Sequence, residues 1–169
     1  MIFQLKTRIF SLGGSMDITD FQGMPYYQVQ ASFFSIGKKL DLFDMQGNQL
    51  AHIQQRIIAL APEYDIYQQG QMVANVKEHL FSFFGERFTV ESTAGILEIA
   101  GDWMNWSYSI EMGGMPVATI SKQFAMFQDV YAVDIIDSAD IPLLLSIAIV
   151  VDEVASSGRN QGGLLDNLI

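Results

Sequence analysis

One stretch near the C-terminus restricts the possible folds of this chain more than any other feature. The eleven residues Ile141–Val151 read IPLLLSIAIVV, and Ser146 is the only polar side chain among them. A helix that is apolar on every face has no side that tolerates water, so protein or lipid must enclose it. Eleven residues are well short of the roughly 20 that span a bilayer, and Asp140 and Asp152 bound the run. The run therefore predicts a buried helix and no transmembrane segment.

The two ends of the predicted helix are recognisable in the sequence. Pro142 suits the first helical turn, where its missing N–H costs no hydrogen bond. Asp140 or Ser138 can cap the free amides at the same end. Gly158 is typical of a helix C-terminus. These signals predict a helix over residues 141–156.

An internal repeat precedes the helix and is typical of β-hairpins. Three segments, 43–53, 66–76 and 110–120, align without gaps, with a glycine four positions and an alanine eight positions after the first apolar residue. A weaker copy spans 19–29. Glycine supplies the positive φ of a tight turn, and the flanking Val, Ile and Phe favour strands. We expect four hairpins whose recurring alanines face inward and leave room for the helix: Ala51, Ala74 and Ala118.

The fold class follows from the number of strands. Four other segments also read as strands: Phe33–Gly37, Leu80–Gly85, Arg87–Ser92 and Tyr131–Ile136. Ten to twelve strands exceed what a twisted open sheet usually holds, and closure removes its edges. Such a barrel is too wide for its own side chains to fill, so the apolar helix supplies the core. We predict a mainly β (α+β), closed antiparallel barrel of about twelve strands around a central buried C-terminal helix.

Composition limits the classes of protein and partner. With 169 residues, the chain fits one domain, predicted over 1–158 and followed by a flexible or capping tail at 159–169. Its net charge of −10, with only nine Lys and Arg, argues against a nucleic-acid partner. The absence of cysteine excludes disulfides and Cys-ligated zinc. Lys6 and Arg8 interrupt the N-terminal apolar residues, so no signal peptide is expected and the predicted location is cytoplasmic.

An ordered series of segments carries a family resemblance. The segments are FFSIGKKLDLFDMQGNQLAHI, FSFFGERFTVES, GDWMNWSYSI, VATISKQF, YAVDI and LLLSIAIVVDEV. Over roughly residues 1–155 the chain resembles bacterial members of the LURP-one-related family, which is similar to tubby C-terminal domains and phospholipid scramblases. The resemblance implies a twelve-stranded barrel around a central helix and little about activity.

The chain also departs from those relatives. Tubby-like domains hold phosphoinositides with Lys and Arg, and no such motif can be placed here residue by residue. The scramblase-like branch has a proline-rich N-terminal region and acylated cysteines, whereas this chain has four prolines and no cysteine. Lipid scrambling is therefore not supported.

The sequence contains no motif that indicates catalysis. The two histidines, His52 and His79, are isolated on predicted strands, and no nucleophile elbow, metal-spaced histidine pair or phosphate-binding loop is present. Asp134, Asp137 and Asp140 recur every three residues, but without a Gly-bearing calcium loop they are better explained as an acidic approach to the helix N-terminus. We expect no catalytic residue, no metal site and no cofactor.

Basic residues follow or precede the repeat copies at similar offsets. If neighbouring hairpins bring them to one rim, they can hold an anionic lipid headgroup or face a membrane surface; otherwise they are scattered solubilising charges. The candidate site residues are Lys38, Lys39, Arg56, Lys77 and Lys122. The predicted function is that of a non-catalytic binding or scaffold protein with an undetermined ligand.

Two other functions remain open. The first is a protein-interaction module, because exposed aromatic residues anchor many interfaces; Trp103, Trp106, Phe83 and Phe84 lie near predicted turns, although a barrel also uses aromatics in its core. The second is a site for a small apolar ligand at the barrel mouth. That site loses its cavity if the helix fills the barrel. The sequence does not indicate the oligomeric state.

Overall fold

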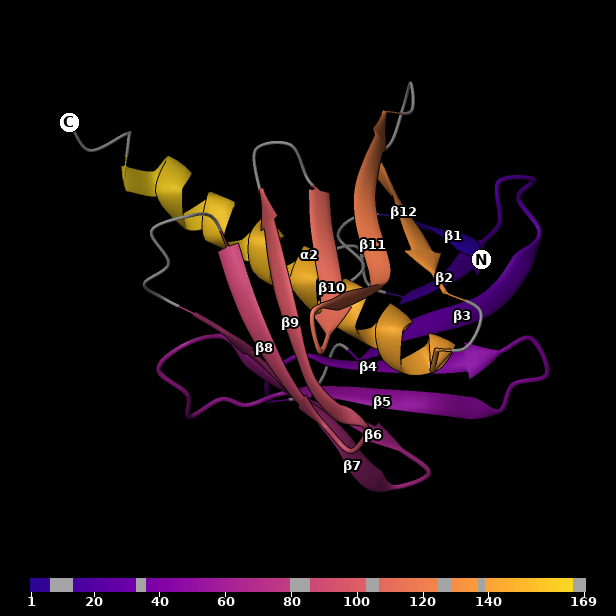
Figure 1. Ribbon diagram of the computed structural model, residues 1–169, viewed down its shortest axis with the longest axis horizontal. Helices are drawn as coiled ribbons and strands as arrows, with labels where there is room; N and C mark the ends of the chain where they lie inside the picture. Colours follow the sequence, from indigo (N-terminus) through magenta and orange to yellow (C-terminus); the bar gives the residue numbers. More distant parts are fainter. Residues whose placement is uncertain are drawn as a thin grey trace.

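The fold is that of a computed structural model, shown in Figure 1. It describes residues 1–6, 14–32, 36–79, 86–102, 107–124, 129–136 and 139–165. The strands are β1 (Ile2–Lys6), β2 (Gly14–Thr19), β3 (Pro25–Ser32), β4 (Lys39–Asp44), β5 (Gln49–Gln55), β6 (Glu63–Gln68), β7 (Gln71–Glu78), β8 (Glu86–Ser92), β9 (Gly95–Asp102), β10 (Ser107–Met112), β11 (Met115–Phe124) and β12 (Asp129–Ile135). The helix α2 spans Ile141–Leu165.

The strands form a closed barrel in which each strand pairs antiparallel with its neighbours in the chain. β1 closes the barrel: it pairs with β12 from Ile2↔Asp134 to Lys6↔Val130, and with β2 at Gln4↔Thr19. None of the twelve described strands has an unpaired edge, which is the advantage of closure that the strand count predicted. The predicted fold class, a twelve-stranded antiparallel barrel with a C-terminal helix, is confirmed.

All four repeat copies form hairpins, but their turns are of two kinds. In the second and third copies both central residues have positive φ: Gln69 (50°) with Gly70 (76°), and Gly113 (60°) with Gly114 (76°). This is the geometry of the type I′ turn, whose twist matches that of the strands. In the first and weak copies the turn is longer, because an aspartate side chain organises it. Asp44 Oδ1 accepts hydrogen bonds from the amides of Gln46 (2.9 Å) and Asn48 (2.8 Å).

This difference gives the first copy a different strand pairing, although the sequences of the copies align without gaps. Ala74 lies opposite Ile66 and Ala118 opposite Ile110, as the alignment implies. Ala51 lies opposite Leu42 and not Phe43, because the longer turn takes up one more residue of the first strand. The three alanines are nevertheless all buried, so the prediction that they face inward is confirmed.

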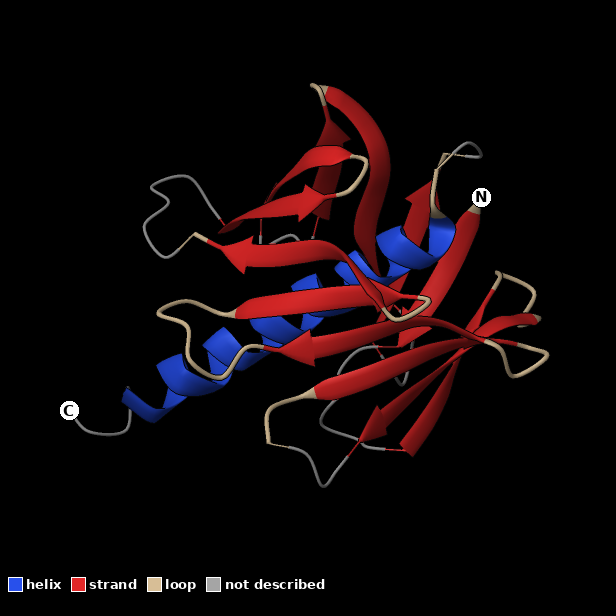
Figure 2. Ribbon diagram, turned by 90° about the horizontal axis from the view of Figure 1, so that it is seen from below, coloured by secondary structure: helices blue, strands red, loops and turns tan. Residues whose placement is uncertain are grey.

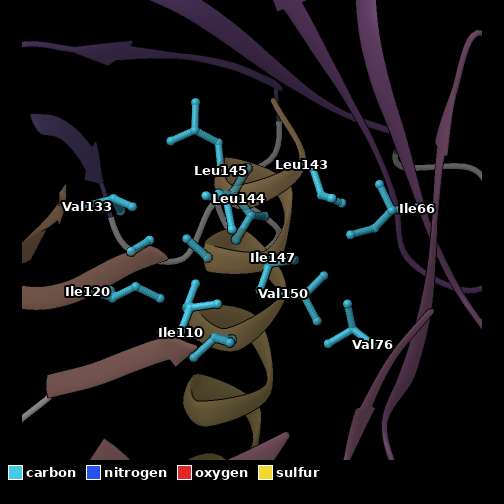
Figure 3. Packing of buried hydrophobic residues seen from close by; sticks show 14 of the residues in the cluster. Ile66, Val76, Ile110, Ile120, Val133, Leu143, Leu144, Leu145, Ile147 and Val150 are labelled. Atoms are coloured by element: carbon cyan, nitrogen blue, oxygen red, sulfur yellow. The ribbon is translucent and has the colours of Figure 1, made fainter. Parts of the chain in front are cut away.

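The helix α2 runs lengthwise through the barrel and forms its core, as Figure 2 shows. Side chains of the barrel wall contact it from opposite sides: in Figure 3, Ile66 and Val76 face it from one side and Ile110, Ile120 and Val133 from the other. The helix is therefore apolar all round because it is enclosed all round.

The few polar groups at the start of α2 are satisfied locally. Ser146 is fully buried, and its Oγ donates a hydrogen bond to the Pro142 carbonyl at 2.7 Å. Asp140 caps the helix as predicted, since its Oδ1 accepts a hydrogen bond from the Leu143 amide at 3.0 Å. Ser138, the other predicted cap, lies outside the described residues.

The helix continues beyond its predicted end. Gly158 does not stop α2, which extends to Leu165. A glycine inside a helix costs only about 1 kcal/mol relative to alanine, so without a change of backbone direction it does not end one. The first part of the predicted tail is consequently helical, and residues 166–169 lie outside the described residues. The division into a domain over 1–158 and a tail stays a prediction.

The other predicted strands have mixed outcomes. Arg87–Ser92 lies in β8, and Tyr131–Ile135 lies in β12. The prediction for Phe33–Gly37 is wrong where it can be checked: Ile36 and Gly37 form a bend, because Gly37 has a φ of +80°. Residues 33–35 and the predicted strand Leu80–Gly85 lie outside the described residues.

Candidate functional site

The topology places all five predicted basic residues at the same end of the barrel. Successive strands alternate in direction, so β4 begins at the end where β5, β7 and β11 finish. We call this end the basic rim; it carries Lys38, Lys39, Arg56, Lys77 and Lys122. The opposite end, called the hairpin end, carries the turns at 20–24, 44–48, 69–70, 93–94 and 113–114 and the start of α2.

The segregation of positive charge is more complete than the sequence suggested. Lys6 ends β1, Arg87 lies next to the start of β8, and Arg159 lies on α2 beyond Glu153, which contacts the rim. Eight of the nine basic residues therefore lie at or beyond the basic rim, and Arg8 is outside the described residues. Among the residues that the structure describes, the positive charge at the hairpin end is the α-ammonium group of Met1. This group lies 3.7 Å from Asp134 Oδ1.

Lys38 links the rim to the core helix. Its Nζ forms an ion pair with the buried carboxylate of Glu153 on α2. The buried Tyr64 lies near the Glu153 carboxylate. Burial, together with the negative charge of Glu153, raises the pKa of the Tyr64 hydroxyl. Lys38 thus compensates a carboxylate that would be costly to bury alone.

Arg56 has a comparable structural role on the outer wall. Its Nε donates to Asp65 Oδ2 at 2.7 Å and its Nη1 to Glu63 Oε1 at 2.9 Å. The hydrogen bond that Arg56 donates to Asp65, together with the nearby carboxylates, raises the pKa of the Arg56 guanidinium. Asn75 Nδ2 also donates to Glu63 Oε1 (2.9 Å) and Asp65 Oδ1 (2.8 Å), so both carboxylates are satisfied.

The remaining candidates differ from these two. Lys77 is exposed and lies opposite Glu63 and Thr89 in the neighbouring strands, whereas Lys39 and Lys122 are half-buried. Within the described part of the chain, the ammonium groups of Lys39 and Lys77 make no hydrogen bond or ion pair. The structure therefore brings the five residues to one end but leaves only some of them available to a ligand.

An exposed apolar loop at the basic rim was missed by the sequence reasoning. We define the apolar loop as residues 56–62, between β5 and β6; Ile58 and Leu60 are 100% exposed and Ile57 is 59% exposed. Ile36 (81% exposed) lies nearby, and a Cβ added to Gly37 would come within 3.2 Å of Ile57. The apolar run IIALAP between two strands was the signal that could have revealed this loop.

The two histidines lie on the outer wall. His52 Nδ1 is 2.6 Å from Asp41 Oδ1, and His79 Nε2 is 2.7 Å from Thr89 Oγ1. His52 borders a shallow hollow of about 310 Å³ between β5 and β6. The hollow is lined by Gln49, Leu50, Ala51, His52, Gln54, Tyr67, Gln69 and Gly70. This lining includes no serine, threonine or cysteine that an Asp–His pair could activate as a nucleophile.

Comparisons with known proteins agree with this fold. The family model described as LURP-one-related matches residues 1–152. The chain belongs to the LURP-one-related family. A solved protein from Arabidopsis thaliana is similar to this LURP-one-related chain, with 16% identity and a TM-score of 0.64 over 90% of this chain and 91% of that one. At that identity the likeness shows the fold alone. No curated protein matches the chain.

Neither the family nor the barrel fold by itself assigns an activity to the chain. Within the ranges that the structure describes, no three carboxylate or imidazole groups gather as metal ligands, and no helix is long and apolar enough to cross a membrane. Asp140, one of three regularly spaced aspartates, caps α2 and accepts a hydrogen bond from Gln68 Nε2 at 3.2 Å. Asp137 and the four aromatic residues predicted as interface anchors, Trp103, Trp106, Phe83 and Phe84, lie outside the described residues.

Proposed function

We propose that this LURP-one-related protein is a non-catalytic binding protein whose basic rim contacts the anionic headgroups of a membrane surface. The observation that carries the proposal is the segregation of positive charge to one end of the barrel. A local positive field attracts anions even when the whole protein has a net charge of −10. The same asymmetry orients the molecule, with its acidic hairpin end away from the lipid.

The charges available for binding set the expected strength. Lys38 and Arg56 are paired with carboxylates, and Lys39 and Lys77 have no partner among the described residues. Each lysine near an anionic membrane surface contributes about 1 kcal/mol. Binding through the rim charges is therefore expected to be weak and to weaken further with salt.

The alternative is a protein partner that contacts the same end. The observation in its favour is the mixture of charges, because carboxylates of Glu63, Asp65 and Glu153 lie among the basic residues. Paired charges of both signs are common at interfaces between proteins, where they contribute specificity. In either case we propose a cytoplasmic location, since a chain without cysteine depends on no disulfide.

A flotation assay with phosphatidylcholine vesicles, with and without phosphatidylserine, tests the proposal. We expect the protein to float with the anionic vesicles and to be released in about 1 M NaCl, where the Debye length is roughly 3 Å. The double variant Lys39→Ala/Lys77→Ala removes two rim charges without breaking the ion pairs, and it should bind less.

The matched control is Gln46→Glu/Gln71→Glu, which changes the net charge by the same amount at exposed positions of the hairpin end. It should bind like the wild-type protein. Equal losses in both variants would show that net charge alone matters, and absence of flotation by the wild-type protein would reject membrane binding in favour of the protein-partner alternative.

A further inference from the structure

We propose that the apolar loop, together with Ile36, inserts into the interfacial region of the bilayer when the basic rim docks. The inference rests on the proposed membrane binding and adds a second, apolar component to it. It also assigns distinct tasks to neighbouring residues, since the cations select an anionic surface while Ile58 and Leu60 hold the protein there.

The exposure of the loop is unusual for its composition. Single exposed aliphatic side chains are common on protein surfaces. Here Ile58 and Leu60 make no contact that shields them from water, and Ile57 and Ile36 are also mostly exposed, on adjoining segments of one end. Exposed aliphatic groups gathered in this way are typical of surfaces that become buried against another molecule or a membrane.

The base of the loop is held firmly, so the exposed side chains form a fixed projection. The Arg56 amide donates to the Glu63 carbonyl at 2.9 Å, and the Glu78 amide donates to the Pro62 carbonyl at 3.1 Å. The Gln55 amide donates to the Lys38 carbonyl at 2.9 Å, which joins the Ile36 segment to the same base. Insertion of the tip therefore requires no rearrangement of the barrel.

The charges around the loop favour an anionic bilayer as the occupant. In each rim ion pair the cation is the exposed partner: the Lys38 side chain is 39% exposed against 7% for Glu153, and Arg56 is 44% exposed against 10% for Asp65. At these two pairs, a surface that approaches this end therefore meets the ammonium and guanidinium groups before the carboxylates. Aliphatic tips flanked by exposed cations match a headgroup layer above hydrocarbon.

Because the chain has no cysteine, one introduced thiol reports the position of the loop. Ile58→Cys is labelled with an environment-sensitive fluorophore, and Met45→Cys, an exposed apolar position at the hairpin end, is the matched control. With phosphatidylserine-containing vesicles we expect a blue shift and quenching by brominated acyl chains at position 58 only. A second variant, Ile58→Ser/Leu60→Ser, should lower vesicle affinity at least tenfold with an unchanged urea midpoint.

The outcomes separate this inference from the proposed function. If the protein floats with anionic vesicles but the label at position 58 neither shifts nor is quenched, insertion is rejected and docking through the rim charges stands. If the wild-type protein does not float, the proposed function fails and insertion fails with it. A fluorophore shift that depends on protein concentration without vesicles would identify a second copy of the chain as the occupant and would also overturn insertion.

Discussion

The two ends of the barrel are built from the same strands but differ in turns, charge and exposure. At the hairpin end the connections are tight, glycines adopt positive φ, and Asp20 and Asp44 organise turns with their carboxylates. At the basic rim the described connection 56–62 is longer and mostly apolar, the cation of each ion pair is its more exposed partner, and α2 leaves the barrel. We propose that the hairpin end specifies the fold and that the basic rim is the binding end.

A physical reason underlies this division. Short turns fix the register of their strands, so they admit few residue types. A longer connection adds little closure entropy and can carry residues chosen for contact with other molecules. In this chain the basic rim, which has the longer connection, also carries most of the basic residues.

The largest effect should come from comparing one substitution in the core with the same substitution on the apolar loop. Leu145→Ala removes a fully buried side chain of α2 and is expected to lower the free energy of unfolding by 2–5 kcal/mol, as an order of magnitude for buried leucines. Leu60→Ala should change it by less than about 0.5 kcal/mol, because Leu60 is fully exposed. Urea denaturation measures both. Similar losses would mean that Leu60 packs against the protein and is not available to a membrane.

Two glycines, one near each end of the barrel, differ in why they cannot be replaced without a loss of stability. Gly101, in β9 towards the basic rim, lies under Tyr108, and a Cβ there would come within 2.1 Å of the ring and 2.6 Å of the Ser107 carbonyl oxygen. Gly47, at the hairpin end, has open space around it but a φ of +85°. We expect Gly101→Ala to cost about 3 kcal/mol by overpacking and Gly47→Ala about 1 kcal/mol by backbone strain. Thermal unfolding measures both losses of stability. A larger loss for Gly47→Ala than for Gly101→Ala would show that the contact between Gly101 and Tyr108 leaves room for a methyl group.

The ion pair between the rim and the helix gives a third comparison. Lys38→Met removes the ammonium group that pairs with the buried Glu153 carboxylate and should cost about 1–2 kcal/mol, between the values for exposed and buried pairs. Lys77→Met is the control, because Lys77 is exposed and has no partner among the described residues. Chemical denaturation of both variants at pH 7 is the measurement. If Lys38→Met and Lys77→Met lower the free energy of unfolding equally, the Lys38–Glu153 pair does not stabilise the packing of α2 in the barrel.

The smallest expected effect concerns Asp44. Hydrogen bonds from the Asn48 side chain and from turn amides hold the pKa of Asp44 below its usual range. Its contribution to stability is therefore present above the unfolded-state pKa near 4 and is lost as the pH falls through the lower folded-state pKa. The difference in Tm between the wild-type protein and Asp44→Ala should be constant from pH 5 to 7 and shrink below about pH 4. A difference that grows on acidification would contradict this assignment.

The sequence predicted the parts of the fold that depend on local patterns. The apolar run predicted a buried helix, and the glycine–alanine spacing located three hairpins and their inward alanines, with the weaker copy as a fourth hairpin. The sequence also held a sign of the two longer turns that the repeat alignment passed over: the aspartate that organises them, Asp20 or Asp44, is replaced by Tyr67 and Glu111 in the copies with two-residue turns. Gly158 was misleading as a stop signal, since a single residue type does not determine backbone direction.

The site was less predictable because its contacts join distant residues. Lys38 and Glu153 are 115 positions apart, and the pairing of Arg56 with Asp65 depends on which face of β6 points outward. The gathering of basic residues could be expected from the hairpin offsets alone. Whether each cation was paired or free required the packed structure.

Hydrogen–deuterium exchange of the protein, free and bound to phosphatidylserine-containing vesicles, tests the central claim most directly, because it compares both ends in one experiment. Peptides that cover residues 56–62 should exchange more slowly on vesicles, while peptides that cover the hairpin turn at 69–72 should be unchanged. Protection at the hairpin turn, or equal protection at both ends, would contradict the claim that the basic rim is the binding end.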